Sequence, residues 1–217
     1  MARVKAIFDA DILIHLVETD SIKFALGTLD CIYVSEYVYQ HEIRKGTEAE
    51  KLIKKLINKK QLKILTYKGL TAQQKRIYGE TYKLLERETI SDDPEKNPIN
   101  KGERVTAAFA KASNIYYYMS DDNKAAPYIR SLVEVEVVNF CDILFLYLRI
   151  FGKDDIEELR ISYKSFIDSY GDRNNIPKIL KVKDRVLPFE EMMGRCYDKF
   201  DNNINLKRLI SNIEANI

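Results

Sequence analysis

The sequence contains few of the residues that form disulfide frameworks or metal-binding histidine pairs. Its 217 residues include three cysteines, an odd number without a CxxC pair, and two histidines without a ligand spacing such as HxxxH. Cys31, Cys141 and Cys196 suit a reduced cytoplasmic protein, in which they are most simply small buried hydrophobes. Neither histidine is predicted to be catalytic.

Long apolar runs are also missing. No stretch of about 18 uncharged apolar residues exists to span a membrane, and Asp9 and Asp11 interrupt the apolar segment that a signal peptide would need. We therefore expect a cytoplasmic location and no membrane partner. Lys and Arg number 35 against 33 Asp and Glu. This balance points neither to nucleic acid nor away from it, because local patches matter more than net charge.

Short apolar runs alternate with helical periodicity through the first part of the chain. The predicted strands span 3–8, 31–34, 62–66, 115–119 and 135–138. Helices are predicted at 12–17, 36–44, 48–59, 71–88 and 103–113 and from about 123, with a loop at 91–102 that contains two prolines. The alternation predicts an α/β fold, a parallel β-sheet flanked by helices.

No strand pattern follows Phe140. Helices are predicted at 141–151, 154–170, 188–200 and 204–215, with an irregular connector at 177–188. We therefore expect an α/β domain over 1–140 and a helical C-terminal extension over 141–217 that packs on it. The extension suits a lid, an oligomer surface or a partner-docking element, and the sequence does not separate these roles.

Acidic residues fall at the ends of the apolar segments. Asp9 and Asp11 follow the first strand, Glu42 follows the second, Glu103 begins a helix of small residues, and Asp121 and Asp122 follow the strand at 115–119. Parallel strands bring such ends to one edge of the sheet, where ligands bind. Carboxylates that meet there repel one another unless cations neutralise them. Oxygen ligands of this kind predict Mg²⁺ or Mn²⁺ and phosphodiester hydrolysis, the chemistry of a metal-dependent nuclease.

Each acid also has an ordinary structural interpretation. Asp9 is compatible with a solvated turn, the Asp121–Asp122 pair with a helix cap, and Glu103 with a first-turn glutamate. The combination is more informative than any one member. Ala107 and Ala110 share the helical face of Glu103, and such small side chains allow a helix to approach the sheet and bring its acid near the others.

The segments DADILI, that of Glu42, GERVTAAFAKA and YYMSDDNKA, in this order, resemble the PIN-domain ribonucleases over about residues 3–140. The resemblance implies a PIN-like fold and four catalytic acids, Asp9, Glu42, Glu103 and Asp122. It implies that Asp9, Glu103, Asp121 and Asp122 hold Mg²⁺ or Mn²⁺, with Asp11 and Ser120 as auxiliary residues, Ser120 taking the threonine position of the family's Thr-x-Asp pattern. RNA is the implied substrate. A protein antitoxin or regulator, and a second copy of the chain, are the implied protein partners.

Two features depart from the small toxins of that family, a long insertion at 67–101 and the tail after 140. Two alternatives stay open. FDAD and SDD also resemble the first and last motifs of haloacid-dehalogenase phosphatases, although Leu13 replaces their Thr or Val and Ser120 replaces their Gly. That family gives no role to Glu42 or Glu103. The second alternative is a catalytically silent PIN module that acts by binding.

A basic helical face is the remaining candidate for contact with RNA. The helix at 48–59 carries Lys51, Lys54, Lys55 and Lys59 opposite an apolar face of Leu52, Ile53, Leu56 and Ile57. Such a face is either a solvated surface or a track for phosphates. The tyrosines at 116–118 are predicted mainly to pack in a strand, with stacking on a nucleobase as the alternative.

Overall fold

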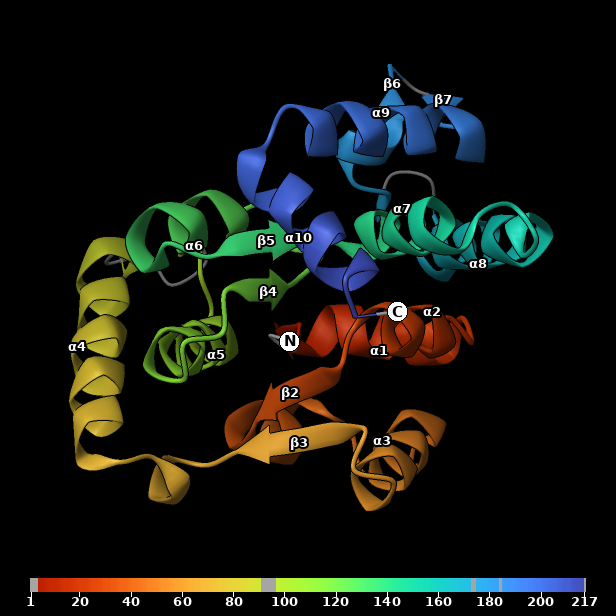
Figure 1. Cartoon of the computed structure of the whole chain (residues 1–217). Coiled ribbons are helices and arrows are strands. Elements are labelled where there is room, and N and C mark those ends of the chain that lie inside the picture. Colours follow the sequence, from red (N-terminus) through yellow and green to blue (C-terminus); the bar gives the residue numbers. More distant parts are fainter. Residues whose placement is uncertain (1–3, 91–96, 173–174, 184, 217) are drawn as a thin grey trace. The chain divides into compact units, whose positions relative to one another are not determined.

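The computed structural model describes residues 4–90, 97–172, 175–183 and 185–216, and its elements are labelled in Figure 1. The described residues divide into two compact units. Unit 1 contains Val4 and the described residues of His15–Leu29 and Phe140–Ile217. Unit 2 contains Lys5–Ile14 and the described residues of Asp30–Asn139.

Unit 2 is built on a sheet of five parallel strands in the order β3-β2-β1-β4-β5. The strands are β1 (Lys5–Phe8), β2 (Cys31–Ser35), β3 (Leu62–Leu65), β4 (Tyr117–Met119) and β5 (Glu136–Val138). The central strand, β1, is apolar and inaccessible over Ala6, Ile7 and Phe8, as expected for a parallel strand covered on both faces. The predicted α/β class with a parallel sheet is confirmed.

Helices flank this sheet. They are α3 (Glu48–Asn58), α4 (Ala72–Thr89), α5 (Lys101–Ala112), α6 (Ala126–Val133) and the π-helical turn η1 (Val38–Glu42), while α1 (Ala10–Glu18) begins in unit 2 and ends in unit 1. Helix α5 packs on β1, β2 and β4, and α4 lies along α5 (Figure 1). Ala107 and Ala110 of α5 are inaccessible in the same core as Ile7. Their small side chains therefore allow the close approach that the sequence predicted.

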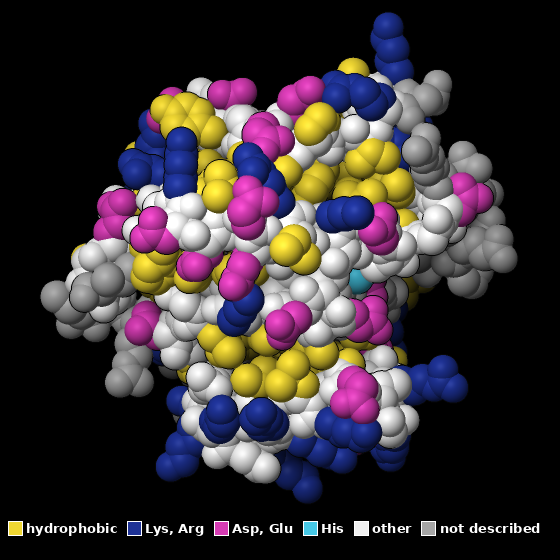
Figure 2. Space-filling model, turned by 90° about the vertical axis from the view of Figure 1, so that its right-hand side faces the viewer, with side chains coloured by type: hydrophobic (Ala, Val, Ile, Leu, Met, Phe, Trp, Pro, Cys, Tyr) yellow, Lys and Arg dark blue, Asp and Glu magenta, His cyan; other side chains and the backbone are white. Residues whose placement is uncertain are grey.

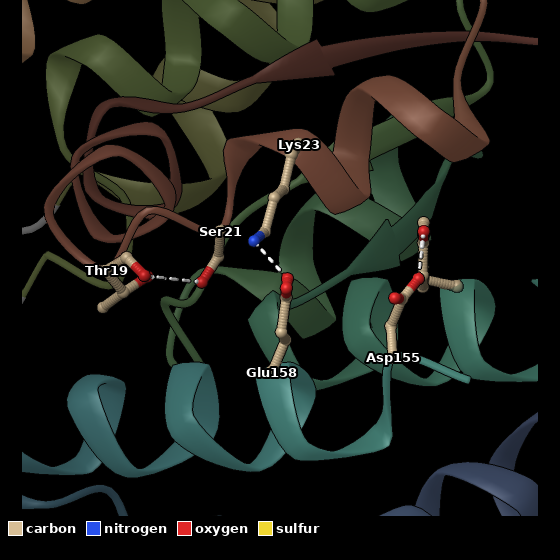
Figure 3. A network of polar contacts seen from close by, with 6 residues as sticks. Thr19, Ser21, Lys23, Asp155 and Glu158 are labelled. Atoms are coloured by element: carbon tan, nitrogen blue, oxygen red, sulfur yellow. Dashed lines mark hydrogen bonds and ion pairs between the residues drawn. The ribbon is translucent and has the colours of Figure 1, made fainter. Parts of the chain in front are cut away.

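Unit 1 is mainly helical. Its elements are α2 (Ile22–Thr28), α7 (Phe140–Phe151), α8 (Ile156–Ser169), α9 (Phe189–Asp201), α10 (Ile204–Glu214) and the strands β6 (Lys181–Val182) and β7 (Arg185–Val186). Aromatic pairs fill its interior, with ring centroids 4.1 Å apart for Phe140 and Phe166. Polar contacts join the helices at the surface: in Figure 3, Lys23 of α2 points to Glu158 of α8, with which it forms an ion pair.

Several sequence predictions need correction. Helix α2 was not predicted, because its seven residues are too few for a clear helical period. The connector at 177–188 contains the antiparallel pair β6 and β7, although no strand was expected after Phe140. The predicted loop at 91–102 extends too far, because α5 already begins at Lys101, and its residues 91–96 lie outside the described part.

Two predictions from composition can be compared with the structure. All three cysteines are buried thiols, which confirms their interpretation as small buried residues. In the described part of the chain, no helix combines the length and apolarity needed to cross a membrane.

Candidate active site

Asp9 lies at the carboxyl edge of the sheet in unit 2. It follows β1 directly, and its N–H donates to the Met119 carbonyl at the end of the neighbouring strand β4 (3.0 Å). Asp9 is only 3% exposed, so the interpretation of a solvated turn residue is wrong. A carboxylate in this position needs a physical explanation, because burial strongly disfavours its charged form.

Glu103 reaches the same region from the first turn of α5. Its N–H donates to Asn100 Oδ1 (2.9 Å), and its Oε2 accepts the N–H of Asn100 (2.7 Å), which together form a capping box. Glu103 is 1% exposed. Burial raises the pKa of Glu103 to about 7, opposed by the Asn100 hydrogen bond and reinforced by the charges of Asp122, Asp11 and Glu42.

Glu42 ends η1, the turn that follows β2. Ser35 fixes the start of this turn, because its Oγ accepts the Val38 N–H (3.2 Å) and also lies 3.1 Å from Thr106 Oγ1 of α5. The Glu42 carboxylate packs directly on Gly102: a Cβ added to Gly102 would lie 1.9 Å from Glu42 Oε1. Only glycine at 102 therefore leaves room for Glu42 in this position. No pattern in the sequence indicates this requirement.

Asp122 and Ser120 are the fourth contribution to the candidate site at the carboxyl edge of the sheet, after Asp9, Glu103 and Glu42. The Asp122 N–H donates to Ser120 Oγ (3.1 Å), and Asp122 Oδ1 accepts the N–H groups of Lys124 (2.6 Å) and Ala125 (3.1 Å) ahead of α6. Asp122 therefore caps the turn that precedes α6, whereas the N-cap of the helix itself is Ala125, which has no side-chain hydrogen bond. The interpretation of Asp121 and Asp122 as a helix-capping pair is wrong, and the charge of Asp122 also acts on Glu103. Asp121 is not among the main charges that act on Asp9, Glu42 or Glu103.

The acids of this edge act on one another through their charges. We call Asp9, Asp11, Glu42, Glu103 and Asp122 the acid edge. Burial, reinforced by Glu103 and Glu42, raises the pKa of Asp9 well above the aspartate range. Burial and then the charge of Asp11 raise the pKa of Glu42. Within the described residues, none of Asp9, Glu42, Glu103 and Asp122 forms an ion pair that would offset the repulsion among these four acids.

Tyr118, predicted to be a packing residue, adds a hydroxyl to this region. It pairs with Ile7 in the sheet, and because strand side chains alternate, it shares a face with Asp9. It is inaccessible to solvent, and no residue within the described ranges forms a hydrogen bond with its Oη. Burial, followed by the charge of Asp9, raises the pKa of Tyr118 well above the tyrosine range. A buried hydroxyl without a partner among the described residues calls for an explanation, and a bound water or ion beside a buried acid is one such explanation.

The acid edge is not a closed metal cage. No group of three His, Cys, Asp or Glu side chains in the described ranges is placed to hold one metal ion. The donor chemistry nevertheless suits a hard divalent cation, because the acid edge consists of carboxylate oxygens. Mg²⁺ usually keeps several waters and takes one or two carboxylates together with substrate phosphates. An open acidic edge fits that mode of binding better than the four-carboxylate set that the sequence suggested.

The lysines of α3 form a separate basic surface. Lys51, Lys54, Lys55 and Lys59 are all exposed, and Figure 2 shows basic side chains gathered at its lower end, the height at which α3 lies in Figure 1. Lys51 pairs with Glu48 (2.6 Å) and Lys54 with Glu50 (2.8 Å) within the helix. These pairs reduce the positive charge available to phosphates, so contact with RNA stays a prediction for this face.

Comparison with protein-family models, curated proteins and solved structures finds no match to this chain. The site must therefore be judged on its own geometry.

Proposed function

We propose that the acid edge of unit 2 binds Mg²⁺ or Mn²⁺ and that the protein is a PIN-like endoribonuclease. One observation carries the proposal: Asp9 is buried, has no ion pair in the described part of the chain, and lies on the same face as the unpartnered Tyr118 hydroxyl. Structural carboxylates are normally paired when buried. Strongly perturbed acids that converge at the carboxyl edge of a parallel sheet are candidates for catalysis.

Asp9 and Glu103 are the residues that we expect to hold the cation, with Asp122 and Glu42 completing its surroundings directly or through water. A bound divalent cation lowers the pKa of a coordinated water and offsets the negative charge of a phosphodiester. The capping box orients Glu103, the Ser120 contact orients Asp122, and Gly102 leaves space for Glu42. Glu42 and Asp122 are half-buried and Asp11 is exposed, so these members can exchange a proton with solvent more readily than the buried Asp9 and Glu103.

The direct experiment measures cleavage of end-labelled single-stranded RNA with Mg²⁺ or Mn²⁺. We expect Asp9→Asn and Asp122→Asn to lower the rate by at least about 100-fold, since even outer-sphere changes cost 10- to 100-fold in metal sites. Asp121→Asn should have a smaller effect, because its charge is not a main influence on the other acids. Glu158→Gln, which alters the exposed ion pair of unit 1, is the matched control and should keep the wild-type rate.

Two outcomes would contradict the proposal. Cleavage that persists in EDTA, or in both Asp→Asn variants, would exclude a role for the acid edge. Hydrolysis of a small phosphate monoester without RNA cleavage would favour the phosphatase alternative. The antitoxin, regulator and homodimer partners implied by the family resemblance stay predictions.

A further inference from the structure

Unit 2 also contains a cavity of about 350 Å³, in which half of the lining residues carry aromatic rings and Glu36 contributes an acid. Three elements contribute to it. Tyr37 and His41 come from the η1 segment, Tyr78 and Tyr82 come from α4, and Lys101 comes from the first turn of α5. The volume lies at the small end of the range for ligand pockets.

The rings form two sets. Tyr37 and His41 have centroids 4.7 Å apart, and Tyr78 and Tyr82, one helical turn apart on α4, lie nearly parallel at 16° with centroids 6.3 Å apart. Tyr78 also packs on the core residue Phe109 (4.8 Å), which anchors this set to the protein interior. Tyr37, Tyr78 and Tyr82 are half-buried and His41 is exposed, so ring surface stays available in the cavity.

A positive charge lies at the same cavity. Lys101 is exposed, and its Nζ is 5.0 Å from the centroid of the Tyr37 ring. Lys101 also lies in the first turn of α5, where the helix macrodipole favours anions. Aromatic surface combined with a positive charge is the combination by which proteins bind single-stranded nucleic acid.

The cavity borders the acid edge. His41 precedes Glu42, and Lys101 precedes Gly102, on which the Glu42 carboxylate packs. A chain that places a phosphate near Glu42 and Glu103 therefore brings a neighbouring nucleotide within reach of the rings.

We propose that this cavity binds one nucleobase of single-stranded RNA, that of a nucleotide flanking the phosphate held at the acid edge. The assignment of RNA as the ligand rests on the proposed function. The assignment of the cavity as a binding site rests on its aromatic rings and on Lys101. Every base has an aromatic face, so stacking here gives affinity with little sequence preference. Bases in a duplex are stacked on one another and cannot enter, so the cavity favours single strands.

The test measures binding without requiring cleavage. Fluorescence anisotropy with a labelled ten-nucleotide oligouridine in EDTA is compared for Asp9→Asn and for Asp9→Asn combined with Tyr82→Leu. We expect the Tyr82→Leu change to weaken binding by about 5- to 150-fold, because stacking contributes about 1–3 kcal/mol per base and 1.4 kcal/mol is tenfold. Adding Tyr82→Phe instead keeps the ring and should restore the affinity.

Controls separate stacking from a general loss of structure. Tyr197→Leu removes an exposed tyrosine of α9 in unit 1 and should leave binding unchanged. Binding of an RNA duplex should also be unaffected by Tyr82→Leu. Unchanged oligouridine affinity in Tyr82→Leu, or an equal loss for duplex and single strand, would overturn the proposal.

A second measurement does not depend on the folding of any pocket variant. Oligouridine carrying 5-iodouridine is crosslinked by near-ultraviolet light to the Asp9→Asn protein, and the modified peptide is identified by mass spectrometry. Crosslinks to Tyr37, Tyr78 or Tyr82 support the proposal, and crosslinks only to other segments contradict it. If the RNA crosslinks in this way but the wild-type protein does not cleave it, the nuclease proposal is rejected and the proposal of a base-binding cavity stands. If the wild-type protein cleaves RNA but Tyr82→Leu leaves oligouridine binding unaltered, only the proposal of a base-binding cavity is rejected.

Salt titration distinguishes Lys101 from the basic surface of α3. Removing one lysine that binds a phosphate of a single strand flattens the dependence of log affinity on log salt by about 0.7, so Lys101→Gln should flatten it by about that amount. A variant in which Lys51, Lys54, Lys55 and Lys59 are all replaced by Gln tests, in the same assay, whether the basic surface of α3 binds RNA phosphates. A salt slope that Lys101→Gln leaves unchanged would contradict the role assigned to Lys101.

Discussion

Buried carboxylates are stabilised differently in the two units. In unit 1, Asp142 is 1% exposed and forms an ion pair with Lys199 of α9. In the same unit, Glu158 pairs with Lys23 (Figure 3), and Asp155 accepts a hydrogen bond from the Tyr147 hydroxyl (2.7 Å). In unit 2, Asp9 is equally buried, yet its charged neighbours are other acids. Burial alone therefore does not distinguish Asp9 from Asp142; the negative charge that surrounds Asp9 does, and it makes Asp9 the candidate for a functional carboxylate.

The largest expected effect is the response of stability to metal. A cation that binds only the folded state at a concentration a thousandfold above its Kd stabilises it by about 4 kcal/mol, which raises the melting temperature by on the order of 10 °C. We expect Mg²⁺ or Mn²⁺ to produce such a rise in the wild type and in Glu158→Gln, and a much smaller one in Asp9→Asn. Equal rises in wild type and Asp9→Asn, measured by differential scanning fluorimetry, would contradict a cation site at Asp9.

The second effect is a pH dependence of the metal-free protein. Glu103 has a folded pKa of about 7, above its ordinary value of 4.5, so the folded state holds the proton more tightly than the unfolded state. The stabilisation from protonated Glu103 is complete below about pH 4.5 and is lost as the pH rises through about 7. At 1.36 kcal/mol per pKa unit, it amounts to at most about 3 kcal/mol.

Urea denaturation in EDTA between pH 5 and 7.5 checks this dependence. Glu103→Gln keeps an acceptor for the Asn100 N–H and should flatten the fall in the free energy of unfolding, whereas Glu158→Gln should follow the wild type. Identical pH profiles for Glu103→Gln and the wild type would show that Glu103 does not titrate in this range.

The strands and the acidic positions were predictable because their signals are local. Apolar runs revealed the five strands of unit 2, and an acid directly after a run, such as Asp9, lies at the carboxyl edge by geometry. The role of Gly102 was not predictable, because it depends on a carboxylate from a distant part of the chain. The Tyr118 hydroxyl was missed since a tyrosine within an apolar strand has the pattern of a packing residue. The aromatic cavity combines three elements, and no sequence period connects Tyr37, Tyr82 and Lys101.

The third expected effect is that of Gly102→Ala, which should lower activity and leave the protein folded. The added Cβ would displace the Glu42 carboxylate, the flexible end of a side chain, so the fold should survive. Alanine gains up to about 1 kcal/mol of helix propensity over glycine. We expect RNA cleavage to fall by about 10- to 100-fold, because displacing a catalytic group by about 1 Å costs this much. Gly194→Ala in α9, where an added Cβ meets nothing within 4 Å, should stabilise the protein without changing the rate. Unchanged cleavage in Gly102→Ala would mean that Glu42 is not needed in this position.

The smallest effect contrasts two buried tyrosine hydroxyls. Tyr118 Oη has no partner among the residues that the structure describes, whereas Tyr163 of unit 1 donates to the Leu187 carbonyl (2.7 Å). Removing an unpaired buried hydroxyl should stabilise the metal-free protein, and removing a paired one should destabilise it, each by about 1 kcal/mol. Chemical denaturation of Tyr118→Phe and Tyr163→Phe in EDTA therefore should give changes of opposite sign. Destabilisation by both would show that Tyr118 has a protein partner in solution.

The contact between Glu42 and Gly102 has a consequence for how such a sequence can diverge. A lineage that acquired any side chain at position 102 would have to shorten, turn away or lose the acid at position 42. Position 102 should therefore stay glycine wherever a full-length glutamate at position 42 keeps this place. A homologue with alanine at 102 and a full-length glutamate at 42 would have to hold that glutamate elsewhere.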